Sequence, residues 1–311
     1  MLSACSIPES TPISRENLSE DGAYAADIHA EKQLAVVSQV SGAIKVYDLI
    51  SREILYSWRH QGEGLNLVDN VKFSRDGDYV ITSDNEAFAL WEIATGEPVG
   101  FWRVEESTIR DIAVANNGRA VLIGKADGSV MFFEPSTERR LEFLAHTEKI
   151  NTVDLSANGK YALTGGNDYK AYLWDTDSAQ IIHVFDHPHR VSKVLIDQNA
   201  KYLFTSDTQD KAQIWDAQSG DEVSRLHFIE RQLIFTSASF SKDSNYLLTG
   251  GPSKKMSLWD TQSGKLLQKW RVAASDGPGP QSAVVYAVNF VDDEAVSVSS
   301  SGNIEKWELK E

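Results

Sequence analysis

The chain has 311 residues, of which 41% are hydrophobic, and its 45 Asp and Glu outnumber its 30 Lys and Arg to give a net charge of −15. A chain of this size and composition can bury about three quarters of its unfolded surface, which excludes intrinsic disorder. The acidic excess argues against nucleic acid as a partner, because phosphate binding requires clustered Lys and Arg. The single cysteine excludes an internal disulfide and a cysteine-based zinc site.

The chain begins with the segment Leu2-Ser3-Ala4-Cys5, and the only cysteine is followed by a stretch rich in Ser and Pro. This segment resembles the lipobox of bacterial lipoproteins, in which the cysteine carries the lipid. The resemblance implies lipidation of Cys5 and a periplasmic protein anchored in the outer membrane, with no membrane contact other than the lipid. A signal segment is expected before such a motif, and only Met1 precedes it here. A cytoplasmic protein with an incidental thiol is therefore the alternative.

A short pattern then recurs seven times along the chain: alternating apolar residues, an aromatic residue and an acidic residue. The aromatic positions, in chain order, are Tyr47, Trp91, Phe133, Trp174, Trp215, Trp259 and Trp307. Their successive spacings are 44, 42, 41, 41, 44 and 48 residues. Because these seven units cover nearly the whole chain, the sequence predicts one repeat domain.

Each unit contains short segments of alternating apolar and polar residues bounded by turn residues, which is the pattern of antiparallel strands. In the fourth unit two such segments span residues 150–156 and 161–166, and a third leads to Trp174. A further segment follows the acidic residue, as at residues 53–58 of the first unit. Four segments per unit predict a four-stranded antiparallel meander.

A single meander of this kind would expose two apolar faces, whereas seven meanders around a ring bury both faces of every sheet. The units resemble WD repeats over about residues 20–311. The resemblance implies an all-β, seven-bladed β-propeller with four-stranded antiparallel blades. The degeneracy of the repeats suggests a bacterial member of the family.

The last unit ends at Glu311, four residues after Trp307, which leaves no room for a fourth strand. The inner strand of the first unit is expected near residues 25–28, with a spare segment before it. We therefore expect residues 13–19 to supply the missing outer strand, so that an N-terminal strand closes the ring. A frayed N-terminal tail is the alternative. Residues 1–12 would then form a tether, and residues 13–311 the propeller.

WD repeats bury a hydrogen-bond chain that links a His, a Ser or Thr, an Asp and the strand Trp. The fourth unit carries all four residues at matching positions: His146, Thr164, Asp168 and Trp174. The chain is expected to be structural, because every buried polar group needs a partner. The other units depart from the pattern. The fifth offers His187, Thr205 and Trp215 with Gln209 at the Asp position, the third has Asp127 but Phe133, and the rest keep only fragments.

Differences in unit length place the extra residues in the loops that join one blade to the next, which all emerge on one face. The longest are residues 60–66, 227–233 and 273–282, and the last includes Asp276 and Pro278. The inner strands begin near the same face, at Tyr24, Asp69, Arg110, Asn151, Ser192, Thr236 and Tyr286. Because loops on a rigid scaffold often carry binding residues, this face is the predicted docking surface for a protein partner. Tolerated variation in loop length is the alternative.

No catalytic, cofactor-binding or metal-binding set is expected. His183, His187 and His189 are close in sequence, but His187 aligns with His146 and is expected to be structural. The predicted function is a non-catalytic protein-interaction scaffold. One alternative is an enzyme or small-ligand binder that uses the central channel, like the propeller hydrolases and lactonases. Another is an accessory factor that resembles the propeller lipoprotein of outer-membrane protein assembly.

Overall fold

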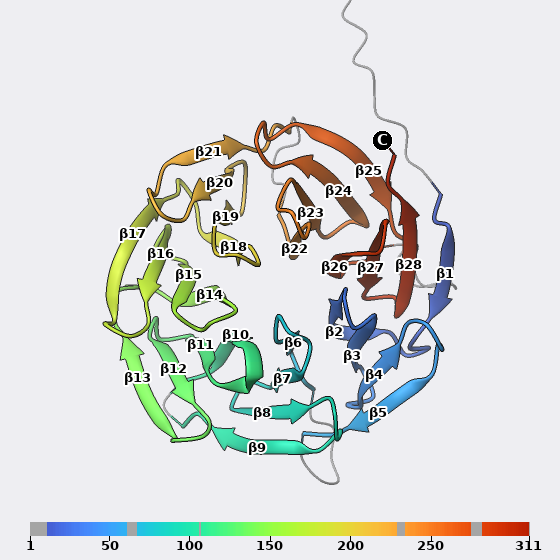
Figure 1. Ribbon diagram of the computed structural model, residues 1–311, viewed down its shortest axis with the longest axis horizontal. Coiled ribbons are helices and arrows are strands. Elements are labelled where there is room, and N and C mark those ends of the chain that lie inside the picture. The colour runs from blue at the N-terminus through green and yellow to red at the C-terminus, as the bar shows by residue number, and fades with distance from the viewer. Residues whose placement is uncertain (1–10, 61–66, 106, 229–233, 275–281, 311) are drawn as a thin grey trace, which may run out of the picture.

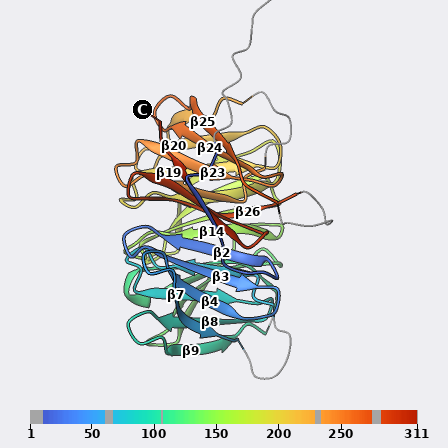
Figure 2. The ribbon, with the colours of Figure 1, turned by 90° about the vertical axis from the view of Figure 1, so that its right-hand side faces the viewer.

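The computed structural model describes residues 11–60, 67–105, 107–228, 234–274 and 282–310. In these residues 28 strands form seven four-stranded antiparallel sheets, which stand around a central axis as the blades of a propeller (Figure 1). Seen from the side, the ring is a flattened disc (Figure 2). The predicted all-β, seven-bladed propeller is confirmed. The described residues contain no helix that is long and apolar enough to span a membrane.

The first three blades follow one another in chain order, each with its first strand innermost (Figure 1). Blade one contains β2 (Ala23–His29), β3 (Leu34–Gln39), β4 (Ile44–Asp48) and β5 (Ile54–Trp58). Blade two contains β6 (Asn70–Phe73), β7 (Tyr79–Ser83), β8 (Ala87–Glu92) and β9 (Pro98–Arg103). Blade three contains β10 (Ile109–Val114), the short 3-10 helix η1 (Asn116–Gly118), β11 (Val121–Lys125), β12 (Val130–Glu134) and β13 (Arg139–Phe143).

The remaining four blades complete the ring. Blade four contains β14 (Ile150–Leu155), β15 (Tyr161–Gly166), β16 (Lys170–Asp175) and β17 (Gln180–Asp186). Blade five contains β18 (Val191–Ile196), β19 (Tyr202–Asp207), β20 (Ala212–Asp216) and β21 (Glu222–Arg225). Blade six contains β22 (Ser237–Phe240), β23 (Tyr246–Gly250), β24 (Lys255–Asp260) and β25 (Leu266–Arg271). Blade seven contains β26 (Val285–Val291), β27 (Glu294–Ser299), β28 (Asn303–Glu308) and, from the other end of the chain, β1 (Ser14–Asn17).

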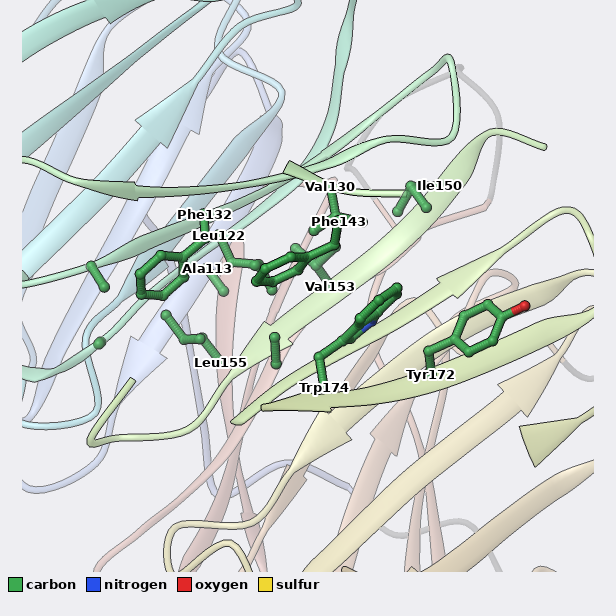
Figure 3. Packing of buried hydrophobic residues seen from close by; sticks show 13 residues of the cluster. Ala113, Leu122, Val130, Phe132, Phe143, Ile150, Val153, Leu155, Tyr172 and Trp174 are labelled. Atoms are coloured by element: carbon green, nitrogen blue, oxygen red, sulfur yellow. The ribbon is translucent and has the colours of Figure 1, made fainter. Parts of the chain in front are cut away.

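The hydrophobic core is divided among the interfaces between neighbouring blades, with one buried cluster at each of the seven. Between blades three and four, the ring of Phe143 stacks on Trp174 with their centroids 5.2 Å apart (Figure 3). Leu122 and Val153 lie in the same cluster (Figure 3). The strand aromatic of each repeat thus packs against the next or preceding blade, which explains why it recurs with the period of the fold.

The N-terminal strand closes the ring, as predicted for residues 13–19. Strand β1 pairs antiparallel with β28 from Ser14 opposite Lys306 to Asn17 opposite Asn303. The backbone N–H of Ile13 extends this ladder with a bond of 2.7 Å to the carbonyl of Lys306. The first inner strand begins at Ala23, two residues before the predicted segment. Blade seven is therefore built from both ends of the chain.

Candidate functional site

The residues predicted for the docking face lie where the inner strands begin. In five blades the strand pairing shifts there by one residue, and the extra residues are Tyr24, Arg110, Asn151, Ser192 and Tyr286. Asp69 and Thr236 occupy the same position just before β6 and β22, where their backbone N–H groups bond to Ser83 and Gly250. A β-bulge redirects a side chain out of the alternating pattern of its strand. The repeated irregularity therefore sets one residue of each blade at the rim of the channel.

These seven side chains are not equivalent. In blades four, five and six they bond to the propeller itself: Asn151 Nδ2 donates to the carbonyl of Val191 at 2.8 Å, Ser192 Oγ to Asp207 at 2.9 Å and Thr236 Oγ1 to Val285 at 2.6 Å. The side chains of the other four have no hydrogen bond or ion pair among the described residues. These four are Tyr286, Tyr24, Asp69 and Arg110, in blades seven, one, two and three. We call them the docking arc.

The docking arc is partly exposed and carries both charges. Tyr24 is 42% exposed, Arg110 is exposed, and Asp69 and Tyr286 are half-buried. Burial and the nearby charge of Asp84 raise the pKa of Asp69, and Arg110 offsets this only in part. Burial also raises the pKa of Tyr286, to which the neighbouring Tyr24 contributes. The arc thus combines two aromatic rings, an acid and a base within four adjacent blades.

Three further predicted site residues, Asp276, Pro278 and Cys5, lie outside the described residues. They retain the roles given to them from the sequence as predictions only.

The four polar residues predicted in the fourth unit come together in blade four. The Nδ1 atom of His146 lies 2.9 Å from Asp168 Oδ2, and its Nε2 atom lies 2.8 Å from Thr164 Oγ1. The indole N–H of Trp174 donates to the same hydroxyl at 2.9 Å. Because the hydroxyl accepts from the indole, it donates its own proton to Nε2, and Nδ1–H donates to the carboxylate. His146, Thr164 and Trp174 are all buried, so these three members of the chain lie inside the blade.

A second complete chain lies in blade two, where the sequence predicted only fragments. His60 contacts Asp84 at 3.2 Å and Thr82 Oγ1 at 3.0 Å, and Trp91 donates to Thr82 at 2.9 Å. The sequence prediction was wrong for this blade because it sought the Asp four residues after the Thr, as in blade four. In blade two the Asp follows the Thr by only two residues and reaches the His from the end of strand β7.

The prediction that Gln209 takes the Asp position in blade five is also wrong. The acid is Asp207, again two residues after Thr205, and Gln209 contributes only a backbone N–H to it, at 2.9 Å. His187 Nε2 lies 2.9 Å from Thr205 Oγ1, but its Nδ1 lies 3.9 Å from Asp207, beyond hydrogen-bond distance. Blade five therefore has the residues of the chain with one link open.

Among the described residues of the last two blades, the chain is represented by the link to the indole. Trp259 donates to Thr249 at 2.8 Å in blade six, and Trp307 donates to Ser297 at 3.2 Å in blade seven. In blade three, Asp127 caps its own turn by accepting bonds from the backbone and hydroxyl of Ser129. The hydrogen-bond chain is therefore complete in some blades and partial in others.

Comparison with known proteins agrees with this arrangement. The family model of the WD domain, G-beta repeat, matches residues 138–175 and 227–260. The first match ends just after the complete chain of blade four, and the second ends just after Trp259. The chain contains WD40 repeats and folds as a seven-bladed propeller. No curated protein matches the chain. WD40 propellers commonly act as scaffolds for protein interactions.

The chain of blade two makes the stability of the WD40 propeller dependent on pH. Burial would raise the pKa of Asp84, but bonds from His60 and the backbone N–H groups of Glu86 and Ala87 outweigh it and lower the pKa to about 2. The folded-state value lies below the unfolded value of 3.8, so the stabilisation is complete above that value and is lost as the pH falls from about 4 to about 2. We expect the wild type to lose about 2 kcal/mol more than Asp84→Asn over this range, measured by urea unfolding. Parallel pH profiles would contradict the role of Asp84.

The WD40 propeller also encloses a central cavity of about 1480 Å³. Every inner strand contributes the residue three positions after its rim residue: Asp27, Lys72, Ala113, Asp154, Leu195, Ser239 and Asn289. The lining continues to the first turns of several blades, including Glu31, Gln198 and Asp243. Because these turns lie at the far ends of the inner strands, the cavity extends toward the face opposite the docking arc. The sequence analysis did not predict these cavity-lining residues. Isolated charged residues in otherwise apolar inner strands could have indicated them.

Three carboxylates on the inner strands hold neighbouring blades together. Asp27 accepts the backbone N–H of Phe73 at 2.8 Å, Asp111 that of Val153 at 2.8 Å, and Asp154 that of Ile196 at 2.7 Å. In each case the acid lies on one inner strand and the N–H on the inner strand of the next blade. These bonds give each of the three acids a structural role between two blades.

No group of three His, Cys, Asp or Glu side chains in the described part of the chain has the geometry of a metal site. Of the three histidines close in sequence, His183 bonds to the carbonyl of Gln218 at 3.2 Å, whereas His187 bonds to Thr205 inside blade five.

Proposed function

We propose that this WD40 propeller is a non-catalytic protein-interaction scaffold whose partner binds the docking arc. The observation that carries the proposal is the division of the rim. Blades four to six bond their rim side chains to the propeller's own backbone. In the part of the chain that the structure describes, the side chains of Tyr286, Tyr24, Asp69 and Arg110 make no such bonds. Polar groups held in a fixed place without internal partners are suited to contact another molecule.

The chemistry of the arc supports a protein partner. Tyr and Arg are enriched at protein interfaces, where they combine a large apolar area with hydrogen-bonding groups at little entropic cost. The arc offers two Tyr and one Arg on a rigid frame, so little conformational freedom is lost on binding. The channel acids support the absence of catalysis, because their oxygens are engaged with backbone N–H groups.

The compartment is a separate part of the proposal. The lipobox-like segment Leu2-Ser3-Ala4-Cys5 supports a bacterial, periplasmic lipoprotein held in the outer membrane by a lipid on Cys5. Expression from the native chromosomal locus tests this, with mass spectrometry of the N-terminal peptide from the membrane fraction. A diacylglyceryl group on Cys5 is expected. An unmodified Cys5 thiol in a soluble fraction would support the cytoplasmic alternative.

Photocrosslinking in the native host tests the docking arc. We expect a crosslinker at Tyr24 to give a discrete product with one partner, and Arg110→Glu to abolish that product by reversing a charge at the interface. Two exposed tyrosines provide matched controls: Tyr169, which follows strand β15 in blade four, and Tyr246, at the start of β23 near the opposite face. Both controls should give little product. A product of equal yield from Tyr246, or one that survives Arg110→Glu, would contradict the proposal.

A further inference from the structure

The central cavity contains a cation that the propeller's own hydrogen bonds leave unused. Lys193 lies on inner strand β18, one position after the rim residue, and its side chain lines the cavity. It makes no hydrogen bond or ion pair among the described residues, and it is half-buried. An ammonium group in such a place has lost part of its hydration without gaining a partner.

Two other cations that line the cavity, Lys72 and Arg75, are engaged with the propeller itself. Lys72 Nζ lies 2.9 Å from Asp111 Oδ1 and donates to the carbonyl of Val153 at 3.0 Å. Arg75 Nη2 lies 2.6 Å from Asp154 Oδ2 and donates to the carbonyl of Ile196 at 2.6 Å. Both pairs therefore belong to the framework that joins the blades, and they cannot turn toward a ligand without breaking it.

Asp27, an acid on inner strand β2, does not serve as the partner of Lys193. Asp27 accepts the N–H of Ile28 at 2.9 Å with one oxygen and that of Phe73 at 2.8 Å with the other. Asp27, Asp111 and Asp154 act on the charge of Lys193 from a distance. None of the three forms an ion pair with Lys193, so direct contact with its ammonium group is left open.

We propose that Lys193 is the anchor of a binding site in the central channel for a small anion, one that presents a carboxylate or phosphate group. The site goes beyond the scaffold function, because it lies inside the ring and extends to the face opposite the docking arc. The volume of about 1480 Å³ is ample for a small metabolite and its waters. A compact anion would supply the charge-assisted hydrogen bonds that the protein itself does not provide.

The electrostatic environment of Lys193 agrees with this role. Burial lowers the pKa of Lys193, the charge of Lys72 lowers it further, and Asp111, Asp154 and Asp27 oppose the shift. An anion in contact with the ammonium group would stabilise its charged form and raise this pKa. We therefore expect the pKa of Lys193 to be higher in the complex with the anion than in the free protein.

Calorimetry on the full chain tests the site, with inorganic phosphate and succinate as separate probes and sodium chloride at matched ionic strength as the reference. We expect at least one of the two anions to bind with one-to-one stoichiometry, and the probe that binds distinguishes a phosphate from a carboxylate ligand. Lys193→Gln should weaken binding by about tenfold to a hundredfold, and Lys193→Arg should retain most of it. Lys265→Gln, which removes an exposed Lys on an outer turn, is the control for net charge and should bind as the wild type does.

A measurement on the wild type keeps the test independent of whether the variants fold. Lysine acetylation mapped by mass spectrometry should show that the bound anion protects Lys193 and leaves Lys265 equally reactive. Binding of neither anion above the chloride reference, equal binding by Lys193→Gln, or the absence of protection would each overturn the proposal. Lys193→Gln should leave the Tyr24 crosslink unchanged, so this proposal and the docking arc fail separately.

Discussion

A chain that begins at Leu18 should be about 4 kcal/mol less stable than one that begins at Pro12, because it lacks the strand that closes the ring. The shorter chain loses the ladder between β1 and β28, with its four residue pairs, and the flanking bond from Ile13 to Lys306. At about 1 kcal/mol for each backbone hydrogen bond, the loss amounts to about 4 kcal/mol. Urea unfolding of the two chains, followed by tryptophan fluorescence, measures the difference.

The loss has a second source in the side chains. Arg15 pairs with Glu305 at 2.7 Å, and Glu305 is fully buried, so its carboxylate would face an exposed strand edge without this cation. The chain that begins at Pro12 keeps all of these contacts and is the matched control. Equal unfolding midpoints for the two chains would show that closure by β1 adds nothing to the stability of the ring.

Thr164→Val in blade four should cost about 4 kcal/mol, and Thr249→Val in blade six only about 2 kcal/mol. Both substitutions keep the shape of the side chain and remove its hydroxyl. In blade four this leaves two buried groups without a partner, Trp174 Nε1 and His146 Nε2, whereas in blade six it leaves only Trp259 Nε1. Each unsatisfied buried group costs about 1–3 kcal/mol, which sets the ratio of the two effects.

Blade two provides an internal control for this comparison. Thr82 holds both His60 and Trp91, so Thr82→Val should cost more than Thr249→Val in urea unfolding. It should cost no more than Thr164→Val, because His60 Nε2 also lies 3.3 Å from the carbonyl of Thr82, which valine keeps. If all three substitutions cost the same, the histidine would add nothing to the chain. A large effect in blades two and four alone would show that stability is concentrated where the chain is complete.

The architecture could be predicted from the sequence because it depends on periodicity. A recurring aromatic such as Trp174 marks the same strand in every unit, and each sheet must bury both of its faces. The ring closure was also predicted, and the pairing of β1 with β28 confirms it.

The polar chains of blades two and five could not be predicted in this way. The contact between the carboxylate and its histidine joins residues that are far apart in the sequence. The turn after the second strand determines whether the acid lies two or four residues beyond the threonine. Asp207 is the last residue of that strand in blade five, and Asp84 directly follows that strand in blade two. Both carboxylates also accept hydrogen bonds from N–H groups of the turn. A search at one fixed spacing therefore found Asp168 and missed them.

The docking arc and the channel site depend on contacts between blades, which no single repeat contains. Asn151 and Arg110 occupy equivalent positions in the sequence, and only the structure shows that Asn151 bonds to the next blade while Arg110 does not. In the sequence, Lys193 likewise resembles any charged residue of an alternating strand. Only the structure shows that it lines the central cavity. Such properties arise from the assembled ring.

The pairing of Arg15 with Glu305 joins residues 290 positions apart, so the ring remains open until nearly the whole chain exists. During synthesis, strand β1 emerges from the ribosome long before β28. Six blades can form before the strand that pairs with β1 has been made. A ribosome that stalls before residue 303 thus releases a horseshoe with an unprotected strand at one end, a species that quality-control proteases and chaperones can distinguish from the finished ring.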